Sequence, residues 1–398
     1  MPESSPRGAD LFHHFRSADP RRLHFAAHSH HPWPDATLEA QRQYWLDSAR
    51  WLDRKWETLI FAELVPAVQA QIAATLGLSR AQNIAFAGNT HELLLRLLSC
   101  LPPASHRVPR VLTSDSEFHS FERQTRRLEE DGLLRVSRVP AEPFDSFTAR
   151  FAAAAAGDDF DLLFCSQVFF NSGYALDDLA AIAGAARRAE TLVAIDGYHG
   201  FMALPTDLSA LEDRIFYIAG GYKYAMAGEG CCFIHVPDGY AARPRDTGWF
   251  AEIGALGRES ESAADRLPYA ADGMRFWGAT FDPSGLYRMR AAFDALQAAG
   301  LDVATRRERV QRLQGQFLDG LAQLGHGELD AARLLVADAA RRGHFLTFRT
   351  PRAAELSAAL LAREVVVDQR GDRLRFGFGI YQSEADVAHL LQRLATLD

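Results

Sequence analysis

The sequence is poor in cysteine, has no excess of positive charge and contains no long uninterrupted apolar run. Its four cysteines show neither disulfide nor metal-site spacing, so we expect buried, reduced thiols. The formal net charge of −8 at pH 7 disfavours nucleic acids and anionic membranes as partners, because like charges repel. Without an apolar run of about 18 residues, or a signal peptide in residues 1–10, we expect neither a membrane span nor secretion, and hence a cytoplasmic location.

What the sequence does contain is an alternation of apolar strand-like runs with amphipathic helical runs. Strands are expected at 83–87, 110–113, 162–166, 192–196, 215–219 and 231–235. Such an alternation predicts an α/β fold with a mostly parallel sheet that is covered on both faces. A long helix is expected from residue 35 to about residue 76, with a kink at Pro66.

The chain is long enough for one large domain and one smaller domain. We expect an N-terminal arm and entrance loop at 1–45, a large domain at 46–285 and a small α+β domain at 286–398. The first 20 residues look like a loose arm. The small domain is expected to open with one helix from Leu286 to about Leu324 and to contain a hairpin turn at 369–372.

Two candidate catalytic residues follow separate strands. Asp196 ends the apolar run 192–196, and Lys223 lies in Gly-Gly-Tyr-Lys-Tyr just after the run 215–219. Ligands of an open parallel sheet bind beyond the carboxyl ends of its strands, so both side chains are expected in one crevice. A carboxylate facing a pyridine nitrogen and a lysine forming an imine suit pyridoxal 5'-phosphate (PLP) chemistry. Taken singly, Asp196 could be a strand-end cap and Lys223 a surface lysine.

Weaker signals nearby are consistent with a phosphate-bearing aromatic cofactor. Gly88, Asn89 and Thr90 fall between an expected strand and a helix N-terminus, where backbone N–H groups and a hydroxyl can hold phosphate. Phe118 follows another expected strand and could stack on an aromatic ring, although a core phenylalanine is the simpler interpretation. Each of these signals gains weight only from the Asp196–Lys223 pair.

Taken in order, these segments resemble the class V aminotransferase superfamily of fold-type I PLP enzymes, and within it the kynureninases. The stretch 194–208 resembles the kynureninase pattern D-x-A-H…G…LP-x-DL, with Tyr198 in place of alanine. The stretch 221–230 resembles the lysine loop GYKY of the same family. The resemblance implies a mostly parallel seven-stranded sheet, PLP as the cofactor and an α-amino acid as the substrate.

The resemblance also implies a role for each matching residue. Lys223 would hold PLP as a Schiff base and remove the substrate Cα proton, Asp196 would pair with the pyridine nitrogen, and Tyr222 would return a proton to Cβ. Trp249 and Thr280 match positions that reach the neighbouring subunit's cofactor, which implies a homodimer with shared sites. The other implied cofactor contacts are Gly88, Asn89, Thr90, Phe118, Gln167, His199 and, at the phosphate, Tyr222.

The substrate side resembles the family less closely. Arg375 matches the arginine that grips the substrate α-carboxylate, which a guanidinium binds through two parallel hydrogen bonds. The loop His28-Ser29-His30-His31 replaces a different kynureninase sequence, and the aspartate of a second substrate-side motif is missing. We expect this loop to line the entrance, with His28, Ser29 and His30 near the substrate. No metal is expected there, because no cysteine or carboxylate stands at usable spacing.

These residues predict a PLP-dependent enzyme acting on an α-amino acid, with kynureninase-like hydrolytic Cβ–Cγ cleavage as the leading hypothesis. Class V transamination and a cysteine-desulfurase-like β-elimination are alternatives on the same cofactor. Against a desulfurase, no cysteine lies beyond Cys232. A non-catalytic PLP-fold binding or regulatory protein is the third possibility, and the retained Asp196, Lys223 and Arg375 count against it.

Overall fold

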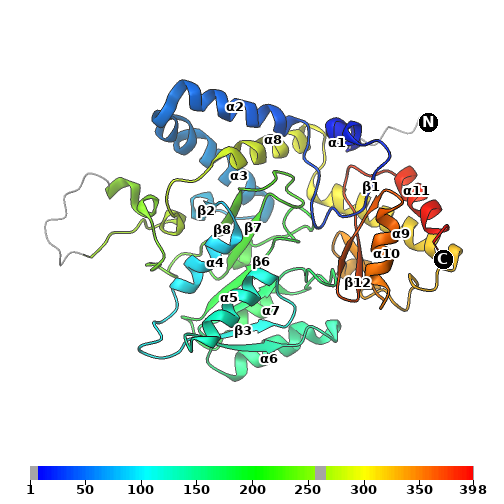
Figure 1. Ribbon diagram of the computed structural model, residues 1–398. Coiled ribbons are helices and arrows are strands. Elements are labelled where there is room, and N and C mark those ends of the chain that lie inside the picture. Colours follow the sequence, from blue (N-terminus) through cyan, green and yellow to red (C-terminus); the bar gives the residue numbers. More distant parts are fainter. Residues whose placement is uncertain (1–7, 256–265, 398) are drawn as a thin grey trace.

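A seven-stranded sheet forms the centre of the larger domain in the computed structural model, which describes residues 8–255 and 266–397 (Figure 1). The strand order is β2-β8-β7-β6-β5-β3-β4, and only the pairs that involve β8 are antiparallel. The strands are β2 (Ile84–Ala87), β3 (Arg110–Ser114), β4 (Arg135–Val139), β5 (Leu162–Ser166), β6 (Leu192–Asp196), β7 (Phe216–Gly220) and β8 (Cys232–His235). The expected mostly parallel seven-stranded sheet is confirmed.

The inner strands are buried because helices cover the sheet. Every residue of β5 and of β7 is buried, which explains why these strands are continuous apolar runs rather than alternating ones. The helices of this domain are α2 (Ala36–Trp51), α3 (Val65–Leu76), α4 (Thr90–Ser99), α5 (His119–Glu130), α6 (Phe147–Gly157), α7 (Leu179–Gly184) and α8 (Ser284–Ala298). Parallel pairing brings the carboxyl ends of β5, β6 and β7 to one edge, with Ser166 opposite Asp196.

The smaller domain has its own sheet and its own core. Its antiparallel strands are β9 (Phe345–Arg349), β11 (Asp368–Arg370) and β12 (Arg373–Gly377), in the order β11-β12-β9. Its helices are α9 (Val303–Leu324), α10 (Ala353–Leu361) and α11 (Glu384–Leu394). The turn between β11 and β12 is the expected hairpin. A separate hydrophobic cluster fills this domain and includes Phe317, Phe348 and Phe376.

The N-terminal segment belongs to this smaller core. Instead of a loose arm, the described part begins with a 3₁₀ turn, Ala9–Phe12, and α1 (His13–Ala18). β1 (Leu23–His24) then pairs in parallel with β10 (Val365–Val366), which links the two ends of the chain. Leu23 and Phe25 are buried in the cluster of the small domain.

The two long helices that the sequence predicts are both broken. The first ends at Leu52, whose φ is 50°, and a π-helix over Trp56–Leu64 precedes α3. Pro66 lies in the first turn of α3, directly after the π-helix ends, so the change of helix type coincides with the expected kink site. The second is broken at Gly300, after which Asp302 caps α9 through the Thr305 N–H. The helix α8 lies along α2, and its residues Leu286 and Met289 are buried in the core cluster of the large domain (Figure 1).

One helical run has the length and composition of a membrane span. Within Trp56–Leu76, the most apolar stretch of 18 residues has a mean hydropathy of 1.5, and 39% of that stretch is buried inside the protein. Val68 and Ile72, fully buried, belong to the core of the large domain. Length and hydropathy alone do not distinguish such a run from a core helix, because a core helix can have the same values.

Candidate active site

A cavity of about 410 Å³ lies where the carboxyl ends of the large-domain strands meet the small domain. Asp196 ends β6 and Lys223 follows β7, and both side chains line this cavity, as the sequence leads us to expect. The structure also places in its wall Gly88, Asn89, Thr90, Phe118, His199, Tyr222, His28, Ser29 and Arg375. Residues more than 300 positions apart in the chain therefore share one pocket.

Lys223 is held against aromatic rings and a histidine. Its Nζ lies 2.5 Å from Nε2 of His199, and 4.9 and 5.5 Å from the ring centres of Tyr198 and Phe118. Burial lowers the pKa of Lys223 to about 7, against the opposing charge of Asp196. Burial and the Lys223 charge hold the pKa of His199 well below its usual value, so this histidine is neutral. A substantial share of Lys223 is thus an uncharged amine near neutral pH, the form that attacks carbonyl carbon and accepts protons.

Asp196 is a buried carboxylate whose surroundings fit a cationic ring nitrogen. Its Oδ1 accepts a hydrogen bond from the Tyr198 N–H at 2.9 Å. Burial raises the pKa of Asp196, and this hydrogen bond together with the Lys223 charge opposes the rise. A protonated pyridine nitrogen would supply both a further donor and a compensating charge, so the residues present fit PLP.

The N-terminus of α4 provides the matching phosphate site. Asn89 caps this helix, because its Oδ1 accepts the Glu92 N–H at 3.0 Å and its Nδ2 donates to Glu92 Oε1 at 2.8 Å. With the Asn89 side chain committed to the cap, a phosphate would be held by first-turn N–H groups and the Thr90 hydroxyl. Gly88 and Tyr222 line the same cavity.

Arg375 lies in the cavity wall on β12 and is already paired. Its guanidinium donates to Asp368 Oδ2 and to the Phe170 carbonyl oxygen. Asp368 also accepts a hydrogen bond from Arg370 at 2.9 Å and lies 3.5 Å from Nε2 of His28. Burial lowers the pKa of Arg375 to about 10, against the opposing effect of Asp368, and the side chain stays cationic. The carboxylate of Asp368 therefore fixes Arg375 in one orientation at the cavity.

Asp368 is a site residue that our sequence reasoning missed, although a signal for it exists. β11 and β12 pair with Arg370 opposite Arg373, which puts Asp368 directly opposite Arg375. Cross-strand neighbours of opposite charge attract each other. The expected hairpin turn at 369–372 could have revealed this pair, because extending the pairing of its two strands away from the turn places Asp368 opposite Arg375.

The side chain of Gln167, expected near the cofactor, is hydrogen-bonded to two other side chains. Its Oε1 accepts the Tyr217 hydroxyl at 2.8 Å and its Nε2 donates to Thr206 at 2.9 Å. Among the described residues that line the cavity, Ser166 is present and Gln167 is not. Successive residues of an extended chain point to opposite sides, so the residue before Gln167 is the one that faces the cavity.

Three further expected residues lie outside this cavity. His30 is exposed, and its ring centre lies 5.1 Å from that of Tyr222. Trp249 is 47% exposed and Thr280 is also exposed, and neither is among the described residues that line this chain's own pocket. The structure of one chain therefore brings His28 and Ser29 to the site, but not His30, Trp249 or Thr280.

A buried carboxylate beneath the cavity was also missed. Glu117 accepts hydrogen bonds from the hydroxyls of Ser114 at 2.5 Å and Ser166 at 2.6 Å. Burial raises its pKa to about 7, the two serines oppose that rise, and the charge of Asp196 adds to it. Glu117 thus ties the ends of β3 and β5 together directly before Phe118. No local sequence pattern distinguishes this glutamate from an exposed one.

Comparison with known proteins identifies the family. The model of the aminotransferase class-V family matches residues 25–390, which is most of the chain. This protein belongs to that family. Isopenicillin N epimerase of Streptomyces clavuligerus is 30% identical over 70% of this chain and 66% of its own length. Kynureninase of Burkholderia pseudomallei (strain 1106a) is 25% identical over 90% of this chain and 85% of its own.

Solved structures show the same fold. A cysteine desulfurase from Thermococcus onnurineus NA1 superposes with a TM-score of 0.76 over 94% of both chains, at 16% identity. The cystine C–S lyase C-DES, in complex with its product cysteine persulfide, gives 0.73 at 18% identity, over 94% of this chain and 97% of its own. The class-V protein is therefore a fold-type I PLP enzyme of the aminotransferase and lyase type, with PLP as its cofactor.

The chemistry available at the cavity follows from these placements. Bound PLP supplies a carbonyl carbon that reacts with amines and a ring that absorbs an electron pair. Asp196 would balance the charge on that ring, and Phe118 and Tyr198 offer aromatic faces beside Lys223. Lys223, uncharged in part near pH 7, can take a proton from an adjacent carbon, and neutral His199 can accept a hydrogen bond from Nζ.

Proposed function

We propose that this class-V enzyme cleaves the Cβ–Cγ bond of kynurenine, or of a related aryl-keto α-amino acid, by hydrolysis. The observation that carries the proposal is that Lys223 and Arg375 line one cavity together with the rings of Phe118, Phe170 and Tyr222. A base, a carboxylate-binding cation and aromatic walls are what such a substrate requires. The relatives named kynureninase, aligned over 90% of this chain, support it.

Each step of this reaction has a residue of suitable chemistry. Arg375 would hold the substrate α-carboxylate, which fixes the Cα–H bond relative to Lys223. Lys223 would remove the Cα proton, and water would add to the γ-carbonyl. Tyr222, beside the lysine and half-buried in the cavity wall, would return a proton to Cβ as the Cβ–Cγ bond breaks. The products would be alanine and an aromatic acid.

The cysteines argue against a desulfurase. Such an enzyme needs an accessible thiol that can take up sulfur, whereas Cys165, Cys231 and Cys232 are buried and Cys100 is half-buried. Cys232 is the one that lines the cavity among the described residues, and its Sγ lies 3.5 Å from the Tyr198 hydroxyl. Burial raises the pKa of Cys232 to about 12, which keeps the thiol protonated and weakly nucleophilic.

The proposal predicts stoichiometric formation of alanine and an aryl acid from kynurenine or hydroxykynurenine. The PLP-loaded protein is incubated with these two, with cysteine and with alanine, and all products are identified by mass spectrometry. Exchange of the Cα proton in deuterated water is followed in parallel. Keto-acid formation would replace the proposal with transamination, and inversion at Cα without cleavage would replace it with epimerisation, the activity named for the Streptomyces relative.

Finding neither proton exchange nor product with any amino acid of the panel, despite bound PLP, would favour a non-catalytic binding protein.

The matched control for replacement of Lys223 is Lys55→Ala, because Lys55 and Lys223 are the two lysines of the sequence. Lys55 lies outside the cavity, with its Nζ 5.9 Å from the ring centre of Tyr44. Its replacement is expected to leave all products unchanged.

We also propose that the enzyme is a homodimer in which Trp249 and Thr280 reach the partner's cofactor. Both are exposed on the isolated chain, and an exposed tryptophan is common at protein interfaces. Sedimentation velocity is expected to show a dimer, and Trp249→Ala to weaken both assembly and PLP retention. A fully active monomer would contradict this arrangement.

A further inference from the structure

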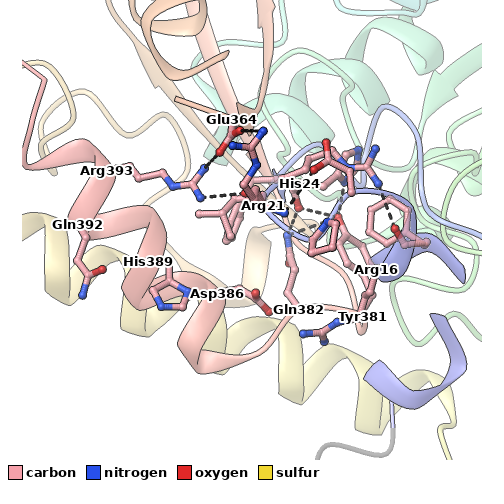
Figure 2. Close-up of a pocket in the computed structure, with 16 residues that line it drawn as sticks. Arg16, Arg21, His24, Glu364, Tyr381, Gln382, Asp386, His389, Gln392 and Arg393 are labelled. Carbon is pink, nitrogen blue, oxygen red and sulfur yellow. Dashed lines mark hydrogen bonds and ion pairs between the residues drawn. The ribbon is translucent and has the colours of Figure 1, made fainter. Parts of the chain in front are cut away.

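A second cavity, of about 540 Å³, lies between the N-terminal segment and α11 (Figure 2). Arg16, Arg21 and Arg22 contribute from one side, and His389 and Arg393 from α11 on the other. Among the described residues, this cavity and the active-site cavity have no lining residue in common. It is therefore a separate pocket that the proposed reaction does not use.

The acidic residues of this second cavity are already engaged. Glu364 lies 3.0 Å from Arg21 and 4.0 Å from Arg393. Asp386 accepts hydrogen bonds from the backbone N–H and the hydroxyl of Ser383, both at 2.7 Å, as part of the cap of α11. Asp19 accepts the backbone N–H of Arg21 at 3.3 Å. Each of these carboxylates therefore already has a partner within the protein.

Several hydrogen-bond donors of the cavity, in contrast, lack a protein partner. Within residues 8–255 and 266–397, the side chains of Arg16, His389 and Gln392 form no hydrogen bond or ion pair. Nε of Arg22 is buried and has no hydrogen-bond partner among the same residues. The Arg22 guanidinium is held in place by the ring of Phe15, 4.5 Å away, and by the Phe15 carbonyl oxygen at 3.2 Å. Figure 2 shows His389 and Gln392 on α11 and Arg16 across the cavity.

We propose that this second cavity binds a small organic anion through Arg16, Arg22 and His389. Guanidinium groups bind carboxylate and phosphate oxygens through paired charge-assisted hydrogen bonds, and the remaining donors of this cavity face a common space. The occupant is a carboxylate or a phosphate ester. Its binding does not require turnover at Lys223.

The second cavity is connected to the active site by one short segment. His24 lines it, and Nδ1 of His24 lies 2.6 Å from the Tyr381 hydroxyl. The next residue, Phe25, donates its N–H to Val366 at 2.7 Å and accepts the Gly377 N–H at 2.6 Å, and His28 lines the active site. Gly377 ends β12, the strand that carries Arg375. An anion that fixes this segment is expected to alter KM for the amino acid while PLP stays bound.

The test measures anion binding to the PLP-loaded enzyme by titration calorimetry at constant ionic strength. Sodium benzoate and inorganic phosphate are the probes, and benzamide is the neutral control. We expect saturable binding of at least one anion and none of benzamide. The double variant Arg16→Gln/His389→Gln should weaken binding about tenfold or more, through loss of charge-assisted hydrogen bonds. Both side chains are exposed, so the fold should tolerate the change.

Arg135→Gln is the matched control, because Arg135 is an exposed arginine of β4 outside both cavities. It should bind anions like the unaltered protein. Equal affinity in the double variant, or loss of binding in Arg375→Leu instead, would overturn the proposal, since the anion would then lie elsewhere or in the active site. Benzoate binding without phosphate binding would identify a carboxylate site, and the reverse a phosphate site. Because binding is measured without turnover, failure here leaves the proposed reaction unaffected.

Discussion

Replacement of Lys223 by alanine is expected to abolish both turnover and the covalent attachment of PLP. The intact protein with PLP should absorb at roughly 410–430 nm, and borohydride should fix the cofactor to one peptide. Lys223 is the residue for this because burial lowers its pKa to about 7, whereas an ordinary lysine is almost wholly charged at that pH. Loss of the Cα base alone should lower kcat by about 10²–10⁴-fold.

The composition of the chain makes this result easy to assign. The sequence contains two lysines, so borohydride trapping followed by peptide mass spectrometry distinguishes Lys223 from Lys55 directly. Lys55→Ala should keep the absorption band, the trapped adduct and the activity. An unchanged adduct in Lys223→Ala would mean that another amine carries the cofactor, and the proposed roles of Asp196 and His199 would fall with it.

The sequence predicts the inner strands of the large domain well because they are continuous apolar runs, whereas the edge strand β4, with its partly exposed residues, is not among the expected strands. β5 and β7 are buried along their full length, and such runs are visible without any knowledge of the partners. The same pattern places Asp196 and Lys223 at neighbouring strand ends, where parallel pairing brings them into one cavity. This part of the site can therefore be predicted from short segments of the sequence and their order along the chain.

The parts that the sequence predicts poorly depend on tertiary packing. The expected helix breaks first at Leu52, where no glycine or proline gives warning, and it changes from π to α directly before Pro66. Gln167 and Ser166 are adjacent polar residues, and the pleat alone decides which of them faces the cavity. Glu117 is buried because two serines from different strands meet there. Each outcome depends on neighbours that lie far away in the chain.

Arg375→Leu is expected to raise KM for the amino-acid substrate by roughly 30-fold to 4000-fold, with PLP still bound. Truncation of one partner of a buried charge pair costs about 2–5 kcal/mol, and every 1.4 kcal/mol is about a factor of ten. Arg375 is buried beside the cavity and is held by Asp368 and by the Phe170 carbonyl oxygen, so its guanidinium is already oriented before substrate arrives. Steady-state kinetics and the PLP absorption band measure the two effects separately.

Two further variants separate substrate binding from folding, because Arg375→Leu also leaves Asp368 without its buried cation. Arg375→Lys keeps the charge but loses the planar fork, and should raise KM by less than leucine does. Arg373→Leu is the matched control, since Arg373 lies on the same strand and donates to the Asn171 carbonyl oxygen at 3.1 Å rather than lining the cavity. Equal loss of PLP and substrate in Arg375→Lys would assign Arg375 to the fold. A selective rise in KM would assign it to the carboxylate.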